Sequence, residues 1–342
     1  MQWNLNIQRQ LTRSMALTVG YVGSTGVHLA HTTYDFDQVP PSLVKIVDSH
    51  YVFPIPANGN LALIQRINPN FGQIRSTEFT GHSTYHALQT NLVERLAKGL
   101  TFQIAYTYAK SIDNGSNTAA DNENLNTVGS PWAFCESCNR GPSDFDLTHN
   151  FVLNFQYDVP IPASVKSHAV TNTILGGWQI GGIYTRQSGG AYNVKITTDR
   201  AFTGSAIVGA TQGGQRPDYL GNLPGCAPGD VTTGDIGHLI KTSCFAFPAP
   251  GVLGNLGRDI FRMPVFRDLD FSVFKNQNLW GEKLKMQFRA EMFNILNNTN
   301  LSANTFANTF DKNGVLNAAF GTPTAPTANQ SRQIQFGLRL LF

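Results

Sequence analysis

The feature that most constrains this chain is an alternation of apolar and polar residues that recurs in segments of about ten residues. In the segment 100–109 every second residue is apolar, and these residues are Leu100, Phe102, Ile104, Tyr106 and Tyr108. Side chains of a β-strand point alternately to the two faces of a sheet, so such a segment has one apolar and one polar face. About ten residues are also enough to cross a bilayer at a tilt. The alternation therefore predicts strands that separate hydrocarbon from water.

The same alternation recurs in nine segments along the chain. Four are long and clear, namely 100–109, 150–159, 284–293 and 333–342, and five are weaker, namely 3–7, 15–21, 88–92, 178–184 and 269–273. Strands of soluble sandwiches also alternate, but they usually extend over only about five or six residues. The pattern predicts an all-β fold, a transmembrane antiparallel β-barrel, of which this chain supplies about nine strands.

The links between these segments alternate between short and long. The short links are 11–14, 97–99, 160–176 and 276–283, and the long links are 26–83, 110–149, 189–266 and 297–331. Outer-membrane barrels show this alternation because their periplasmic turns are short and their extracellular loops are long. Four such long loops are unusual in a soluble domain. The link lengths therefore predict that the long loops share one end of the barrel, the extracellular end.

Composition agrees with a wall between lipid and water. Charged residues make up only 14% of the chain, against about 25% in soluble domains, and Asn, Gln, Thr, Ser and Gly take their place. The net charge of +3 is small and no Lys/Arg-rich run occurs, which argues against nucleic acid as a partner. No run of about 18 apolar residues is present, so any membrane span must consist of strands.

Aromatic residues lie near the predicted strand ends, where outer-membrane barrels carry interfacial girdles. They are Trp3, Tyr21, Tyr106, Tyr108, Tyr157, Trp178, Tyr184 and Trp280. Any single one of them is equally well explained as an ordinary strand or core residue.

Several short stretches, spread in order over nearly the whole chain, resemble one family. They are YVGSTG (21–26) with HL (28–29), NFGQI (70–74), YHALQ (85–89), YTYAKSID (106–113), RGPSDFD (140–146), THNF (148–151), GWQI (177–180), QSG (187–189), LGNLGR (253–258) and FRAEMFNILN (288–297). This series resembles the barrel of Oar-like TonB-dependent receptors, which often carry a carboxypeptidase-regulatory-like domain before the plug. The resemblance implies a barrel of about 22 strands with a plugged lumen, of which residues 1–342 are the C-terminal part.

The same resemblance gives expectations for both chain ends. Residues 332–342 resemble the terminal strand that is read by the barrel-assembly machinery, with an apolar face formed by Ile334, Phe336, Leu338, Leu340 and Phe342. The N-terminus starts inside a strand and has no secretory signal. We therefore expect the plug domain, the TonB-contacting segment and the N-terminal barrel strands to precede Met1. The implied partners are outer-membrane lipid, the TonB energy-transducing complex through that plug, and the assembly machinery.

An odd number of strands has a further consequence. If neighbouring strands alternate in direction, the first and the ninth run the same way and cannot pair in antiparallel fashion. Bacterial single-chain barrels instead have even strand numbers. We therefore expect an open sheet whose two edges have no ladder partners, with Trp3, Leu5 and Ile7 on one edge and Ile334, Phe336 and Leu338 on the other.

The four cysteines lie in two consecutive long links. Cys135 and Cys138 form a C-x-x-C, and Cys226 and Cys244 follow in the next long link. An even number of cysteines in an exported chain favours disulfides, whose connectivity the sequence leaves open. The alternatives are free thiols and a four-cysteine zinc site, but the second pair does not have the C-x-x-C spacing of such zinc sites.

Other candidate sites are better explained by structure than by chemistry. The acids Asp121, Glu123, Asp144 and Asp146 do not follow a calcium-loop pattern, so we expect them to be solvated or to form a salt bridge with Arg140. The stretch 209–216 lacks the Lys and Ser/Thr of a phosphate loop and is interpreted as a flexible loop tip.

No catalytic constellation is evident either. His149 near Asp146 has no placed nucleophile, and Arg289 and Glu291 are interpreted as part of a polar wall. We therefore expect neither enzymatic activity nor a cofactor.

The resulting functional hypothesis is a receptor barrel whose long loops capture a small ligand, a glycan or a chelate, for energised uptake. The loop aromatics Trp132, Phe134, Tyr192 and Tyr219 either stack on such a ligand or pack within their own loops. The alternatives are a stand-alone small porin, a surface adhesin barrel, and a soluble β-rich carbohydrate-binding or glycoside-processing domain.

Overall fold

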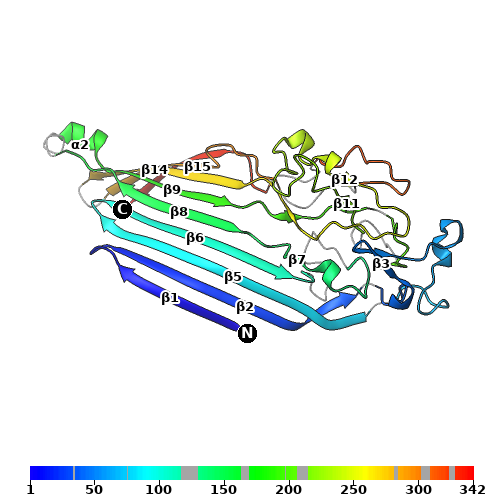
Figure 1. The fold of residues 1–342 in the computed structure, drawn as a ribbon. Helices are drawn as coiled ribbons and strands as arrows, with labels where there is room; N and C mark the ends of the chain where they lie inside the picture. Colours follow the sequence, from blue (N-terminus) through cyan, green and yellow to red (C-terminus); the bar gives the residue numbers. More distant parts are fainter. Residues whose placement is uncertain are drawn as a thin grey trace.

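The computed structural model contains one large antiparallel sheet in which nine long strands follow one another in chain order (Figure 1). The structure describes residues 1–33, 35–74, 76–116, 130–162, 169–196, 198–205, 215–280, 284–301, 309–322 and 328–342. The long strands are β1 (Gln2–Gln10), β2 (Met15–Thr33), β5 (Ser76–Ala97), β6 (Leu100–Asp113), β8 (His149–Asp158), β9 (Trp178–Gln187), β14 (Phe266–Trp280), β15 (Leu284–Phe293) and β16 (Gln333–Leu341). The nine strands expected from the alternation are therefore confirmed.

Several strands extend further than the alternation indicated. β2 has 19 residues and β5 has 22, and they pair beyond Gly26 and Ser83, where the sequence suggested a loop. The expectation of a loop over the whole of 26–83 was therefore wrong for the residues that belong to β2 and β5. The pairing there continues past a bulge between Gly26 and Leu29, and the added residues alternate too weakly in polarity to mark a strand. β14 likewise extends to Trp280, through residues assigned to a short link; the Trp280 side chain itself lies outside the described part.

The sheet is open. Among the described residues, β1 pairs only with β2 and β16 pairs only with β15, so the two edges do not meet. The apolar side chains of these edges are exposed, with Leu5 65% and Phe336 72% accessible. The expected open sheet is confirmed.

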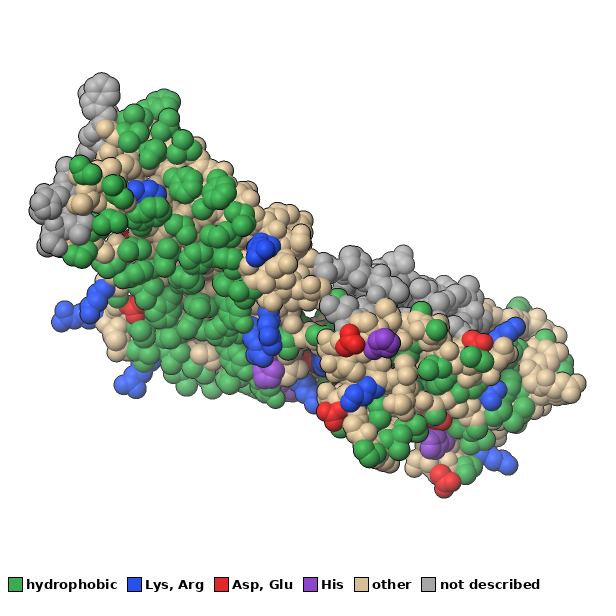
Figure 2. Space-filling view, turned by 90° about the horizontal axis from the view of Figure 1, so that it is seen from above, with side chains coloured by type: hydrophobic (Ala, Val, Ile, Leu, Met, Phe, Trp, Pro, Cys, Tyr) green, Lys and Arg blue, Asp and Glu red, His purple; other side chains and the backbone are tan. Residues whose placement is uncertain are grey.

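The strand register produces one apolar and one polar face. Across β6, β8 and β9 the directly opposed residues Ile104, Leu153 and Tyr184 share the apolar face, which Figure 2 shows as a continuous green surface. On the polar face, amide groups hydrogen-bond across strands. Examples are Gln103 Nε2 donating to Asn91 Oδ1 at 2.8 Å and Gln335 Nε2 donating to Glu291 Oε2 at 2.7 Å.

Two charged residues interrupt the apolar face, and the alternation did not reveal them. Glu94 lies opposite Phe102 and is only 4% exposed. Lys275 lies opposite Trp178, and its ammonium group donates to the Thr173 carbonyl at 2.7 Å. The lysine thereby reaches the C-terminal carbonyls of the helix α2 (Ala169–Leu175), which lies at the end of the sheet away from the long links (Figure 1).

All four long links gather at the other end of the sheet, where they form a second, irregular unit (Figure 1). We call this unit the loop cap and define it as the described residues of 35–74, 114–148, 188–265 and 294–332. Its regular elements are short. They are β3 (Lys45–Val47), β4 (His50–Val52), β7 (Gly141–Pro142), β10 (Ala191–Tyr192), β11 (Asp218–Tyr219), β12 (Phe245–Ala246), β13 (Phe261–Arg262), and the 3-10 turns η1 (Pro41–Leu43), η2 (Ala57–Gly59), η3 (Leu61–Leu63), η4 (Ser137–Asn139), η5 (Ile236–His238) and η6 (Thr242–Cys244).

The most deeply buried apolar side chains of the described chain lie in this cap. One cluster joins the third and fourth long links and includes Tyr192, Leu239, Phe261 and Phe310. A second joins the first three links around Trp132. No helix in the described part is both long and apolar enough to span a bilayer.

Candidate functional site: the loop cap and its charged seam

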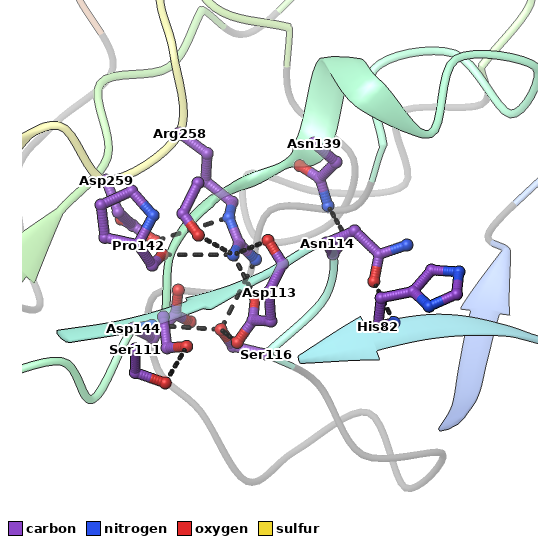
Figure 3. A network of polar contacts seen from close by, with 12 residues as sticks. His82, Ser111, Asp113, Asn114, Ser116, Asn139, Pro142, Asp144, Arg258 and Asp259 are labelled. Carbon is purple, nitrogen blue, oxygen red and sulfur yellow. Dashed lines mark hydrogen bonds and ion pairs between the residues drawn. The ribbon is translucent and has the colours of Figure 1, made fainter. Parts of the chain in front are cut away.

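The cap is joined to the sheet by a group of charged side chains, which we call the charged seam and define as Asp113, Asp144, Asp146, Arg216, Arg258, Asp259 and Arg262. Asp113, the last residue of β6, forms an ion pair with Arg258, and both side chains are at most 5% exposed. The same guanidinium Nη2 donates to the main-chain carbonyls of Asp113 at 3.0 Å and of Pro142 at 3.1 Å (Figure 3). A buried guanidinium needs several acceptors to offset its lost hydration, and the end of β6 and β7 provides them. Arg258 therefore fixes the third long link to the end of β6. We call the sheet of nine long strands, to which β6 belongs, the wall.

A second ion pair continues the seam between Asp146 and Arg262. The Asp146 carboxylate also accepts a hydrogen bond from the Ser111 amide of β6 at 2.6 Å. Both expectations for Asp146, solvation and a salt bridge with Arg140, were wrong. Asp146 is only 3% exposed and pairs with Arg262, which comes from a link more than a hundred residues away, a distance that local spacing cannot indicate. Asp121 and Glu123 lie outside the described residues.

Arg216 is the third arginine of the seam. Its guanidinium is buried and donates to Asn139 Oδ1 at 2.6 Å and to the Cys138 carbonyl at 2.9 Å. Burial, followed by the nearby charge of Arg258, lowers the pKa of Arg216 to about 10. The interpretation of 209–216 as a flexible tip was thus wrong for Gln215 and Arg216, which are 1% and 3% exposed; residues 209–214 lie outside the described part.

An acidic pair completes the seam. Burial raises the pKa of Asp259 well above its usual range, and a hydrogen bond with the Asp144 carboxyl raises it further, while Arg258 and Arg216 oppose the shift. Two carboxyl groups that share a dry site hold a proton between them more readily than in water. The pKa of Asp259 therefore lies above that of an exposed aspartate.

The cysteines stabilise two different parts of the cap. Cys135 is joined to Cys138 next to η4, and Cys226 is joined to Cys244, which ends η6. All four lie at the end of the molecule opposite the short turns. The described residues contain no group of three or more His, Cys, Asp or Glu side chains arranged to hold a metal ion.

The loop aromatics pack within the cap. Trp132 is 3% exposed, its indole N–H donates to the Val39 carbonyl at 2.9 Å, and its ring contacts Phe53 edge-on. Phe134 packs against Trp132, Tyr192 lies in the larger cluster, and Tyr219 packs beside it. All four aromatics therefore pack within the cap, and their stacking on a ligand stays a prediction.

Two clefts meet at Arg140, and we call them together the double cleft. They have volumes of about 250 and 270 Å³ and share Ser137 and Arg140. The first cleft is lined mainly by His50, Arg216 and the stretch 253–257, and the second by His82, Asn114 and Glu136. Arg140 is exposed, and among the described residues no acid forms an ion pair with it. The double cleft thus offers a free guanidinium and several amide and imidazole groups to a small polar ligand.

Sequence reasoning did not identify the double cleft as a site, although two of the family-like stretches, RGPSDFD and LGNLGR, contribute to it. The stretch 253–257 needs Gly254 because a Cβ there would come within 2.0 Å of the Arg216 carbonyl oxygen. This close backbone approach builds the wall of the cleft. The glycines of LGNLGR were the only available signal in the sequence. They indicate a close backbone approach, but they do not identify the segment that is approached.

The remaining candidates are structural in the described part. The His149 Nδ1 is 2.9 Å from the Tyr106 hydroxyl, so this histidine belongs to the strand surface and does not pair with Asp146. Arg289 Nε donates to Gln287 Oε1 at 2.7 Å, and Glu291 accepts from Gln335, as a polar wall requires. The role of Ile334, Phe336, Leu338, Leu340 and Phe342 in assembly stays a prediction.

The comparison with protein-family models agrees with this architecture. A family model described as "Outer membrane beta barrel domain" matches residues 1–335. No curated protein matches the sequence. Among solved structures, the chain is similar to the outer membrane transporter YddB from Escherichia coli, with 11% identity, a TM-score of 0.43, and coverage of 98% of this chain and 32% of that one.

It is also similar to FpvA of P. aeruginosa in a complex with a heterologous pyoverdine and iron, with 11% identity, a TM-score of 0.38, and coverage of 98% and 26%. The chain therefore spans about a third and about a quarter of the length of these two structures. Because the family model covers nearly the whole chain, the chain belongs to the outer membrane beta barrel domain family and is a protein of the bacterial outer membrane.

Proposed function

We propose that this chain is the C-terminal barrel part of an Oar-like TonB-dependent receptor, and that its loop cap captures a small ligand for energised uptake. The type of receptor rests on the sequence stretches described above. In this proposal the plug that contacts the TonB complex precedes Met1, and the terminal strand β16 is read by the barrel-assembly machinery. The chain itself carries out no catalysis and needs no cofactor.

The observation that carries the proposal is a folded cap on an outer-membrane wall. A porin needs an unobstructed passage, whereas here the long links pack around two apolar clusters and are fixed to β6 by the charged seam. A preorganised surface binds a ligand at a lower entropic cost than mobile loops do. This favours ligand capture over passive diffusion.

The double cleft is the proposed place of capture. Each of its halves is large enough for a ring-sized group, and Arg140 is the charged group that both halves share. A guanidinium and neighbouring amides suit the carboxylate or hydroxamate groups of a metal chelate, or the hydroxyl groups of a glycan. An Arg140→Ala substitution should remove a charge-assisted hydrogen bond and weaken binding about tenfold or more.

The test uses the full-length receptor in its own cells, supplied with a panel of ferric chelates and oligosaccharides as the sole source of iron or carbon. We expect growth on at least one compound to require the receptor gene, TonB and Arg140. Arg13→Ala, in the short turn 11–14, is the matched control and should grow normally. Growth that requires the gene but not TonB, together with ion conductance in planar bilayers, would favour a porin.

A further inference from the structure

Two arginines face each other on the apolar side of the wall. Arg186 of β9 lies directly opposite Arg267 of β14. By strand parity Arg186 shares its face with Tyr184, and Arg267 shares its face with Leu269, which is the lipid-facing side. Like charges that are directly opposite across two strands destabilise the pair unless an anion lies between them.

The described residues place no such anion between the two arginines. In the described part of the chain neither arginine forms an ion pair with an acid. The neighbouring acids Asp268 and Asp270 lie opposite Thr185 and Ile183, and therefore point to the polar face. Both arginines are exposed. Within the described part of the chain, their charges are therefore open to an anion from outside the protein.

Their position along the strands places them at a membrane border. Arg186 is eight residues from Trp178, and Arg267 is eight residues from Lys275, whose ammonium group reaches α2 at the opposite end of the wall. At about 3.3 Å per residue this separation is about 26 Å along the strand, close to the height of about 25 Å of the apolar band of outer-membrane barrels. Arg186 and Arg267 thus lie at headgroup depth on the side of the loop cap, the outer leaflet.

Basic groups on the neighbouring strands lie on the same face at the same border. The Tyr21 hydroxyl is 2.7 Å from His86 Nδ1, and the equivalent pair Tyr106 and His149 repeats this contact at 2.9 Å. Lys110 is directly opposite His86. Figure 2 shows blue and purple side chains between the green wall and the loops. We call Lys110, Arg186 and Arg267 the cationic girdle; His86 and His149 lie beside it.

We propose that the cationic girdle binds phosphate groups of lipids in the outer leaflet, with one phosphate clamped between Arg186 and Arg267. Guanidinium groups bind phosphate oxygens in a bidentate manner, and two opposed forks surround one phosphate. Directly below the clamp lie Tyr184 and Leu269, an apolar surface on which the acyl chains of the same lipid rest. This continuity of a cationic border with an apolar wall fits an amphiphile and not a soluble anion.

The experiment measures binding of lipid A to the full-length protein, purified from outer membranes in a zwitterionic detergent, by native mass spectrometry. Each arginine near an anionic headgroup contributes about fivefold to affinity, so R186Q/R267Q should bind lipid A about 30-fold more weakly. The matched control R289Q/R339Q removes two arginines from the polar face and should keep its affinity within threefold. Equal affinities for the two double variants would overturn the proposal.

Two further arms keep the test decisive. R186K/R267K retains both charges but loses the bidentate guanidinium forks. It should therefore insert normally, which heat-modifiable gel mobility verifies, and bind lipid A more weakly than the parent. An affinity equal to that of the parent would refute the clamp. Inorganic phosphate tests the soluble source. If millimolar phosphate displaces lipid A completely, the site is one for free anions and the lipid assignment is wrong.

Discussion

The wall and the loop cap are stabilised by different means although one chain forms both. Along β6 most wall side chains are half-buried or exposed on both faces, and ladder pairing holds the strands together. In the cap, Tyr192 and Leu239 are completely buried, two disulfides are present, and arginines pair with acids out of water. The wall depends on lipid to cover its apolar face, whereas the cap carries its own core. The cap should therefore respond to mutation like a soluble domain and the wall like a membrane protein.

The largest effect that separates the two regions should come from Arg258→Ala. The substitution leaves Asp113 buried without its cation, which costs about 3 to 5 kcal/mol of cap stability. Hydrogen exchange measured by mass spectrometry should show faster exchange in 215–262 and unchanged protection in β14 and β15. Arg332→Ala, which removes an exposed guanidinium at the edge of the cap, is the control. If exchange in the wall strands accelerates as much as in the cap, the two regions are not separable.

A charge on the lipid side should affect the wall and spare the cap. Leu153→Arg places a guanidinium in the middle of the apolar face of β8, at an expected cost of about 2 to 4 kcal/mol, while Asn154→Arg places it on the polar face. Leu153 suits this test because no acid lies opposite it, whereas Phe102 of β6 lies opposite Glu94, which would accept an introduced arginine. Urea-dependent folding into lipid vesicles measures the difference, and equal tolerance of both variants would contradict the face assignment.

The smallest effect concerns the pH dependence of the cap. Asp259 has a folded-state pKa above its unfolded value, so the folded cap holds a proton that the unfolded chain releases. Its contribution to stability is fully present below the unfolded pKa of about 4 and is lost as the pH rises through the folded pKa. Asp259→Asn should flatten the rise in cap hydrogen exchange, corrected for intrinsic rates, over this range.

The exposed Asp230→Asn should leave that profile unchanged. A parent protein whose cap becomes more protected as the pH rises above about 4 would show that Asp259 is ionised in the fold.

The sequence by itself determined the wall. In each strand apolar and polar residues alternate, as Leu153 and Asn154 do, because one face meets lipid and the other meets water. This local signal located all nine strands and the open edges. It failed where the strands leave the membrane, as in β2 beyond Gly26, because there both faces meet water and the alternation fades.

Only the tertiary structure decided the cap. Arg258 and Asp113 are separated by 145 residues, Arg216 and Asn139 by 77, and Trp132 and Val39 by 93, and no periodicity links residues at such distances. The partner of Asp146, the burial of Gln215 and the double cleft around Arg140 all follow from which links pack together. The strands of the wall can be predicted from local alternation because each face of the wall meets the same surroundings along its whole length. A cap of irregular loops has no such repeating environment, so its contacts are specified by shape and charge complementarity between distant segments.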